Sequence, residues 1–90
     1  PEVADIIRHL PPDIKVAVKQ ALQALSETPE LGEPLRRELT GLWKYRVRRF
    51  RIVYAINHPS RSLRILAVGH RRRIYDEVTE AVRQGKLPRR

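Results

Sequence analysis

The stretch KYRVRRFRIVY, Lys44–Tyr54, decides the fold because it predicts a tight antiparallel β-hairpin. With a two-residue turn at Arg48-Arg49, Val47 opposes Phe50, and the register of both strands follows from that pair. Directly opposed residues lie on the same face of a sheet, so the hairpin has one apolar face and one cationic face. The apolar face carries Trp43, Tyr45, Val47, Phe50, Ile52 and Tyr54. The other face carries Lys44, Arg46, Arg51 and Val53.

The turn is the least regular part of this hairpin. Two-residue turns usually take Asn-Gly or Asp-Gly, because their backbone needs positive φ angles, and Arg48-Arg49 offers neither. A longer loop or a bulge is therefore an alternative at this position. A slip of one residue would turn the arginines into the core, so the segregation of side chains favours the two-residue turn.

A second basic stretch, GHRRRIY at 69–75, follows the apolar run LRILAV at 63–68. The apolar run predicts a strand in the centre of the sheet, and Gly69 ends it. A histidine titrates near neutral pH, so His70 could exchange protons with a substrate, or it could hold the loop by hydrogen bonding. Tyr75 either seals the edge of the core or presents its hydroxyl to the cationic surface, where guanidinium groups would favour the phenolate.

The excess of positive charge lies wholly in the second part of the chain. The 90 residues carry a net charge of +9, from 19 lysines and arginines against 10 acidic residues. Residues 1–30 hold three basic and five acidic side chains, and residues 31–90 hold 16 basic and five acidic ones. Such a surface either is merely solvated or attracts nucleic acid, an anionic membrane or an acidic protein. The arginines lie largely on predicted strands, which argues against a membrane-surface helix.

Composition excludes several kinds of site. The chain has no cysteine, so it has neither disulfides nor thiolate zinc sites, and its three histidines lack metal-ligand spacing. We therefore expect no metal and no cofactor. No apolar run approaches the roughly 18 residues of a membrane span, so we expect a cytoplasmic protein with no membrane partner.

Helical patterns precede the hairpin. Apolar residues at helical spacing predict a helix over 2–10, which Pro11 and Pro12 end. A second helix is expected to start with Asp13 as its N-cap and to run to Leu25. Together these two helices form an N-terminal helical hairpin whose role is packing.

The remaining segments complete one domain. Between the helices and strands we expect a loop at 26–33, one or two helical turns at 34–39 and a turn at 57–62. The helical period returns from Ile74, and Gly85 marks its end. Residues 1–90 therefore predict a single α+β domain: an N-terminal helical hairpin packed on a small twisted antiparallel sheet, with a C-terminal helix.

Taken in order, the segments LxGLWKYRVRRFRIVYAI and LRILAVGHRRRIY resemble the RelE/ParE superfamily of bacterial toxins. The likeness is greatest to the RelE-type messenger-RNA endonucleases (mRNA interferases), and it covers nearly the whole chain. It implies a compact fold in which helices pack on one face of a twisted antiparallel sheet. Members usually begin with a strand before the first helix. This chain starts at the helix, so we expect that strand to be missing or disordered and a sheet edge to be unpaired.

The resemblance also implies an active site. RelE-like nucleases use two basic residues on the first hairpin strand, an arginine on the second, an arginine after the Gly-His pair and a tyrosine beyond it. By position these become Arg46, Arg48, Arg51, Arg71 and Tyr75. Members often have lysine at the first two positions, and Arg48 falls in the predicted turn. His70 is a reserve candidate for the general acid or base.

The implied reaction is metal-free cleavage of messenger RNA in the ribosomal A site, which stops translation. The ribose 2′-hydroxyl attacks the adjacent phosphate and leaves a 2′,3′-cyclic phosphate and a free 5′-hydroxyl. The hairpin arginines neutralise the charge that develops on phosphorus, Tyr75 acts as the base, and Arg71 stabilises the leaving oxygen. The resemblance further implies a cognate acidic antitoxin that wraps the basic surface and displaces the last helix.

Two other functions stay open at this point. A ParE-like inhibitor of DNA gyrase would use the same scaffold against a protein target. A non-catalytic RNA-binding module would use only the positive charge. Tyr75 and the opposed pair of Arg46 and Arg51 favour the nuclease.

Overall fold

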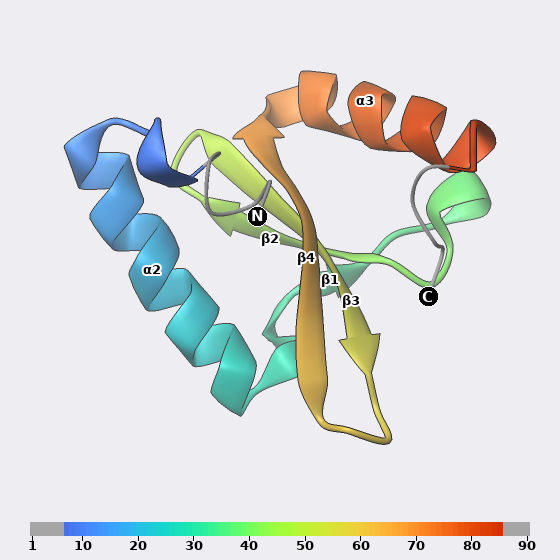
Figure 1. Cartoon of the computed structure of the whole chain (residues 1–90), viewed down its shortest axis with the longest axis horizontal. Helices are drawn as coiled ribbons and strands as arrows, with labels where there is room; N and C mark the ends of the chain where they lie inside the picture. The colour runs from blue at the N-terminus through green and yellow to red at the C-terminus, as the bar shows by residue number, and fades with distance from the viewer. Residues whose placement is uncertain (1–6, 86–90) are drawn as a thin grey trace.

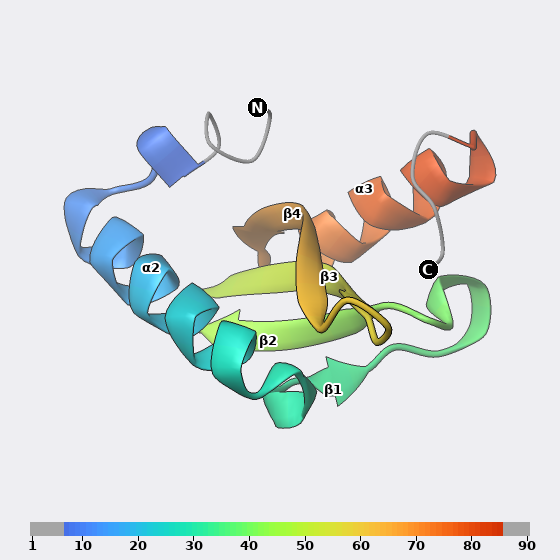
Figure 2. The same ribbon diagram turned by 60° about the horizontal axis from the view of Figure 1, so that its bottom comes forward.

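The computed structural model of the chain describes residues 7–85, without the side chains of Arg71 and Arg72. A four-stranded antiparallel sheet lies between two helices that cover opposite faces (Figures 1 and 2). In chain order the elements are α2 (Pro12–Glu27), η1 (Pro29–Leu31), β1 (Glu33–Pro34), η2 (Arg37–Leu39), β2 (Trp43–Val47), β3 (Phe50–Asn57), β4 (Ser62–His70) and α3 (Arg71–Arg83). The predicted α+β class is confirmed. Most of the predicted first helix at 2–10, and with it the helical hairpin, lies outside the described residues.

The central hairpin has the predicted register. β2 and β3 pair antiparallel, from Val47 opposite Phe50 to Trp43 opposite Tyr54. In the two-residue turn Arg48 takes φ 55°, the positive angle that such turns require at their first central position. The alternative of a longer loop or a bulge in this turn is therefore wrong.

Positive φ is adopted by three arginines among the described non-glycine residues. They are Arg37, Arg48 and Arg61, with φ of 58°, 55° and 55°. Each lies outside the strands, and Arg48 and Arg61 belong to the turns of the two hairpins. A side chain in this region costs roughly 1 kcal/mol relative to glycine, because its Cβ approaches the following carbonyl.

The helix α2 covers the apolar face of the hairpin. It starts at Pro12, whose fixed φ and missing N–H suit the first helical position. Its N-cap is Pro11 and not Asp13, which lies in the first turn. The buried stripe of α2 consists of Ile14, Val18, Ala21 and Leu25, which pack with Val47, Phe50, Ile52, Tyr54 and Val68. No helix within residues 7–85 is long and apolar enough to cross a membrane.

The helix α3 covers the opposite face, so the expectation that the helices share one face is wrong. Val53 and Ala55 of β3 point away from α2, and both are buried. These two side chains form an apolar strip that needs a cover of its own, and the amphipathic α3 supplies it. This second core consists of Leu39, Leu42, Val53, Ala55, Ile74, Val78 and Val82.

The strand β4 lies at an edge of the described sheet, whose order is β1-β2-β3-β4, and not at its centre as predicted. Val53 pairs with Ala67 and Tyr54 with Ile65, so Leu66 has no partner across the bulge. Leu66 and Ala67 then contact the core under α3, whereas Ile65 contacts the core under α2. The sequence of β4 is apolar because helices cover both of its faces, not because strands flank both of its edges.

The segment that leads into the sheet is fixed by Tyr54. Its side chain is fully buried, and its hydroxyl donates a hydrogen bond of 2.6 Å to the carbonyl oxygen of Pro29. The chain passes so close at Gly32 that a Cβ there would collide with the Tyr54 hydroxyl and the Lys44 carbonyl. The short strand β1, which was not predicted, follows at once and pairs with β2.

Replacing Tyr54 with phenylalanine should lower the free energy of unfolding by about 1–2 kcal/mol, because the Pro29 carbonyl loses its donor. Burial raises the pKa of Tyr54 above that of a free tyrosine, so the folded state favours the neutral phenol. This contribution is complete below a pH of about 10 and is lost as the pH rises through the folded-state pKa. Urea unfolding at neutral and alkaline pH measures both effects. The half-buried Tyr45, changed to phenylalanine, is the control, and equal losses in the two variants would contradict the role of the Pro29 bond.

Changing Gly32 to alanine should destabilise the protein by about 1–3 kcal/mol, since the added methyl group overlaps neighbouring atoms. One of those atoms is the Tyr54 hydroxyl. The loss should therefore be smaller when Gly32→Ala is made in the Tyr54→Phe background. Thermal unfolding of the two single variants and the double variant tests this, and strict additivity would show that the hydroxyl is not in the way.

Candidate functional site

The cationic cluster consists of Lys44, Arg46 and Arg51, which project onto the α3 side of the sheet. Lys44 opposes Val53, a member of the α3 core, and Arg46 directly opposes Arg51. Within the described part of the chain, none of these three cations has a carboxylate partner. Like charges that face each other across strands are destabilising, so this arrangement favours the binding of an anion between them.

Backbone carbonyls near the turn hold both guanidinium groups. Arg46 Nε donates a hydrogen bond of 3.2 Å to the carbonyl of Arg48, and Arg51 Nη1 donates one of 3.2 Å to the carbonyl of Phe50. Arg46 is exposed and Arg51 is half-buried. A guanidinium has five N–H donors, so each group retains donors that could bind a phosphate in bidentate fashion.

Tyr75 lies beside this cluster on the second turn of α3. The Lys44 ammonium is 5.7 Å from the centre of the Tyr75 ring, within the range of a cation–π interaction. The rest of the side chain packs against the α3 core. The hydroxyl oxygen is buried and has no hydrogen-bond partner among the described residues. A buried hydroxyl left without a partner costs about 1–3 kcal/mol.

The side chains of Arg48 and His70 lie on the α2 side of the sheet, opposite the face that carries Arg46 and Arg51. Arg48 points from the turn to Asp13 at the start of α2, with 3.5 Å between Nη1 and Oδ2. His70 opposes Phe50 and thus lies on the α2 side, where the two ring centroids are 4.2 Å apart. Arg71 is the first residue of α3, and its side chain is outside the described part.

Comparison with known proteins identifies the family. The family described as "ParE toxin of type II toxin-antitoxin system, parDE" matches residues 2–75. The chain belongs to this toxin family. It is 41% identical over 71 residues to Toxin RelG of Mycobacterium tuberculosis (strain ATCC 25618 / H37Rv), which covers 77% of this chain and 82% of the relative. The crystal structure of the toxin-antitoxin complex RelBE2 from Mycobacterium tuberculosis aligns with a TM-score of 0.65 at 40% identity, covering 72% of this chain and 77% of that one.

These matches confirm the resemblance at the level of the superfamily. The protein is a type II toxin of the RelE/ParE superfamily, with an α+β fold like that of the RelBE2 structure.

Lys44 is a member of the cationic cluster that was not among the candidate residues. The predicted register already placed it on the cationic face, but no role was assigned to it. Its position two residues before Arg46 on the same strand was the available signal, because alternate residues of a strand share a face. What the sequence did not reveal was the position of Tyr75 against Lys44, which depends on how α3 crosses the sheet.

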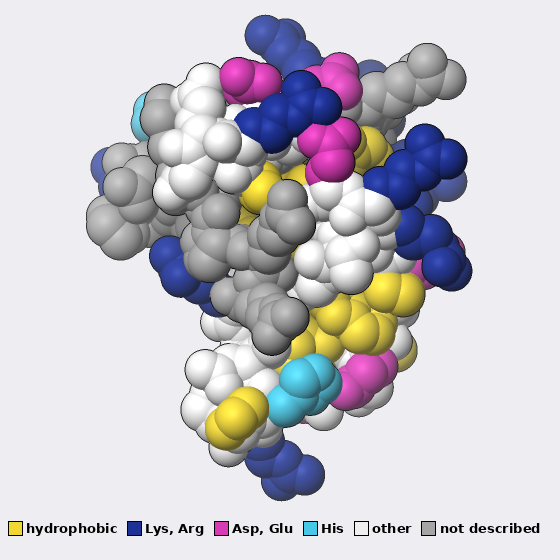
Figure 3. Space-filling view, turned by 90° about the vertical axis from the view of Figure 1, so that its right-hand side faces the viewer, with side chains coloured by type: hydrophobic (Ala, Val, Ile, Leu, Met, Phe, Trp, Pro, Cys, Tyr) yellow, Lys and Arg dark blue, Asp and Glu magenta, His cyan; other side chains and the backbone are white. Residues whose placement is uncertain are grey.

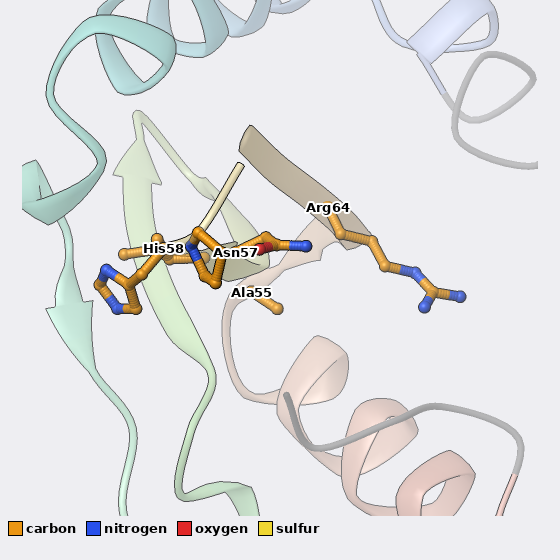
Figure 4. Close-up of a pocket in the computed structure, with 6 residues that line it drawn as sticks. Ala55, Asn57, His58 and Arg64 are labelled. Carbon is orange, nitrogen blue, oxygen red and sulfur yellow. The ribbon is translucent and has the colours of Figure 1, made fainter. Parts of the chain in front are cut away.

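A hollow of about 390 Å³ lies away from the cationic cluster, at the β3–β4 turn. It is lined by Ala55, Ile56, Asn57, His58, Pro59 and Arg64. Figure 4 shows that Arg64 extends away from Asn57 and His58, so these polar groups do not converge on one ligand. The side of the molecule in Figure 3 carries basic and acidic side chains interspersed. Two ion pairs of described α3 side chains agree with this mixture: Arg73 with Glu77 at 3.6 Å and Arg83 with Glu38 at 2.6 Å.

Changing Tyr75 to phenylalanine should raise the free energy of unfolding of the toxin by about 1 kcal/mol, because it removes a buried hydroxyl that has no described partner. Urea unfolding measures the change, and the Tyr45→Phe variant should show almost none. A loss of stability in Tyr75→Phe would mean that the hydroxyl makes a stabilising bond in solution.

Proposed function

We propose that this toxin is a metal-free endoribonuclease that cleaves messenger RNA in the ribosomal A site and so stops translation. The observation that carries the proposal is the opposed pair of Arg46 and Arg51, with Lys44 and Tyr75 beside it on the same face. Two guanidinium groups without described carboxylate partners supply two positive charges, which match the dianionic transition state of phosphodiester cleavage. Membership of the family supports the role of the protein as a toxin. Cleavage of messenger RNA is our proposal for how this toxin acts.

In this mechanism the arginines stabilise the charge of the transition state. The 2′-hydroxyl of the substrate attacks the adjacent phosphorus while its proton passes to the Tyr75 phenolate. The bond to the 5′-oxygen breaks, that oxygen takes a proton from water, and a 2′,3′-cyclic phosphate remains. Arg46 and Arg51 would donate hydrogen bonds to the non-bridging oxygens, where negative charge increases during the attack. The Lys44 ammonium, 5.7 Å from the centre of the Tyr75 ring, would add a third positive charge beside the reacting groups.

The buried position of the Tyr75 hydroxyl sets a condition on this mechanism. While the hydroxyl oxygen of Tyr75 is buried, it cannot contact a ribose of the RNA substrate. The first turns of α3 must therefore shift when RNA binds. The unsatisfied hydroxyl lowers the cost of that shift, since it gains partners when it is exposed.

We assign weaker roles to the remaining candidates. Arg48 adds to the positive field at the turn while its side chain pairs with Asp13, so it should contribute to RNA attraction more than to chemistry. Arg71 begins α3 at the end of the sheet where Arg51 lies, and we propose that it stabilises the leaving oxygen. His70 on the α2 side is poorly placed to exchange protons at a phosphate held by Arg51.

The expected partners follow from charge and from the relatives. The RelBE2 structure is a complex of a toxin with an antitoxin, and we propose that a cognate acidic antitoxin likewise binds this chain, whose net charge is +9. It would cover the cationic cluster and displace α3. With messenger RNA on the ribosome as the substrate, the toxin would act in the cytoplasm.

Inhibition of DNA gyrase is a second candidate function, and the match to the ParE toxin family favours it. It would use the same scaffold against a protein target and would not need Tyr75 or the arginine pair for chemistry. Gyrase poisoning induces the DNA-damage response, whereas cleavage of messenger RNA does not. The two candidates therefore differ in the phenotype of cells that express the toxin.

We expect Arg51→Ala to reduce cleavage of messenger RNA on translating ribosomes by about 10²- to 10³-fold, as loss of a charge-stabilising donor does. Tyr75→Phe should reduce it by about 10²- to 10⁴-fold, as loss of a general base does. Single-turnover assays that map the 2′,3′-cyclic ends measure both effects.

Arg61→Ala is the matched control, since Arg61 lies at the β3–β4 turn, far along β3 from Arg51. It removes the same charge and should leave cleavage nearly unchanged. Full activity of both Arg51→Ala and Tyr75→Phe would refute the nuclease mechanism. Intact RNA together with inhibited supercoiling by gyrase would establish the second candidate, and tight RNA binding without cleavage would indicate a binding module.

A further inference from the structure

The imidazole of His70 is an exposed ring on a rigid support. His70 is exposed to solvent, whereas Phe50 beneath it is only 8% exposed and belongs to the α2 core. The two ring centroids are 4.2 Å apart, and the ring planes are inclined at 38°. One face of the imidazole is thus backed by a fixed aromatic ring, and the residue retains surface that a ligand can reach.

The imidazole lies near the cationic cluster but on the opposite face of the sheet, the face that α2 covers. Phe50 directly precedes Arg51 in β3, and His70 directly follows Gly69, the residue that opposes Arg51. One residue along a strand is about 3.3 Å, and consecutive side chains point to opposite faces. The imidazole and the Arg51 guanidinium therefore lie on the two sides of one rim, where β3 begins and β4 ends.

The aromatic side chains of β2 and β3 do not offer an exposed ring of this kind to a ligand. Tyr54 is fully buried, and Trp43 and Tyr45 pack against the core under α2. Trp43 also stacks on Tyr54, with ring centroids 6.4 Å apart. His70 is thus the exposed ring that the described structure places beside the cationic cluster.

We infer that His70, backed by Phe50, is a specificity-determining residue that stacks on a nucleobase of the RNA substrate next to the phosphate held by Arg46 and Arg51. This inference rests on the proposed nuclease function. Proteins bind single strands by combining cationic contacts to the backbone with aromatic rings on which bases stack. An RNA strand that crosses this end of the sheet can present a phosphate to Arg46 and Arg51 on one face and the adjoining base to His70 on the other. Stacking uses the face of the imidazole, so it differs from the acid–base role that the sequence had suggested for His70.

The test uses a single-stranded RNA of about eight nucleotides, with 2′-O-methyl groups throughout so that the toxin cannot cleave it. The full chain is titrated with this RNA and with copies in which one base at a time is removed. His70→Ala should weaken binding of the intact RNA by about 5- to 100-fold. At one abasic position the same substitution should have no effect, because the stacked base is already absent. His70→Phe should restore binding, since phenylalanine retains a stacking face.

A second readout separates stacking from proton transfer. We expect His70→Phe to cleave a messenger RNA on translating ribosomes with the wild-type pH profile and the wild-type site preference, whereas His70→Ala changes the site preference. If His70→Phe loses cleavage and the pH profile loses an ionisation, His70 is an acid or base and the stacking role is wrong. If His70→Ala binds and cleaves like the wild type at every site, the stacking role of His70 is also wrong, while the nuclease assignment stands. If the wild-type toxin neither binds nor cleaves RNA, both the proposed nuclease function and the stacking role of His70 are wrong.

Discussion

The two-residue turn at Arg48-Arg49 is the constraint on which the rest of the structure depends. It fixes which residues of β2 and β3 oppose each other, and therefore which side chains each helix can cover. A shift by one residue would exchange the faces of the hairpin, burying Arg46 and Arg51 under a helix with no described acidic partner. The cost of such burial is far larger than the roughly 1 kcal/mol that the backbone of Arg48 requires in the turn. The turn is unfavourable locally, and the register makes it necessary.

The α3 side of the sheet combines packing and charge on one surface. Its apolar strip around Val53 and Ala55 anchors α3, and its cationic cluster remains beside the helix. Because Tyr75 belongs to the helix and Lys44 to the sheet, any movement of α3 changes the spacing between the two. A ligand that displaces α3 would therefore separate the tyrosine from the cations. This gives a simple physical basis for control of the site by a partner that competes for the apolar strip.

Sequence reasoning was most successful where side-chain periodicity decides the structure. The hairpin register, the buried stripe of α2 and the grouping of Arg46 with Arg51 all follow from which positions share a face. It failed where three-dimensional packing decides. Nothing local distinguishes a strand flanked by strands from a strand covered by helices, so β4 was placed in the centre. The path of α3 across the sheet depends on the size of Val53 and Ala55 and on the bulge beside Leu66, so neither its face nor the burial of the Tyr75 hydroxyl could be foreseen.

The arginines at positive φ couple the local backbone to the charge of the protein surface. At Arg37, Arg48 and Arg61 the backbone alone would favour glycine or asparagine. Each of these arginines therefore adds a positive charge at a position where its own backbone conformation is unfavourable. A substitution that relaxes the backbone at any of the three positions also makes the protein less basic, so local stability and surface charge cannot be changed independently there.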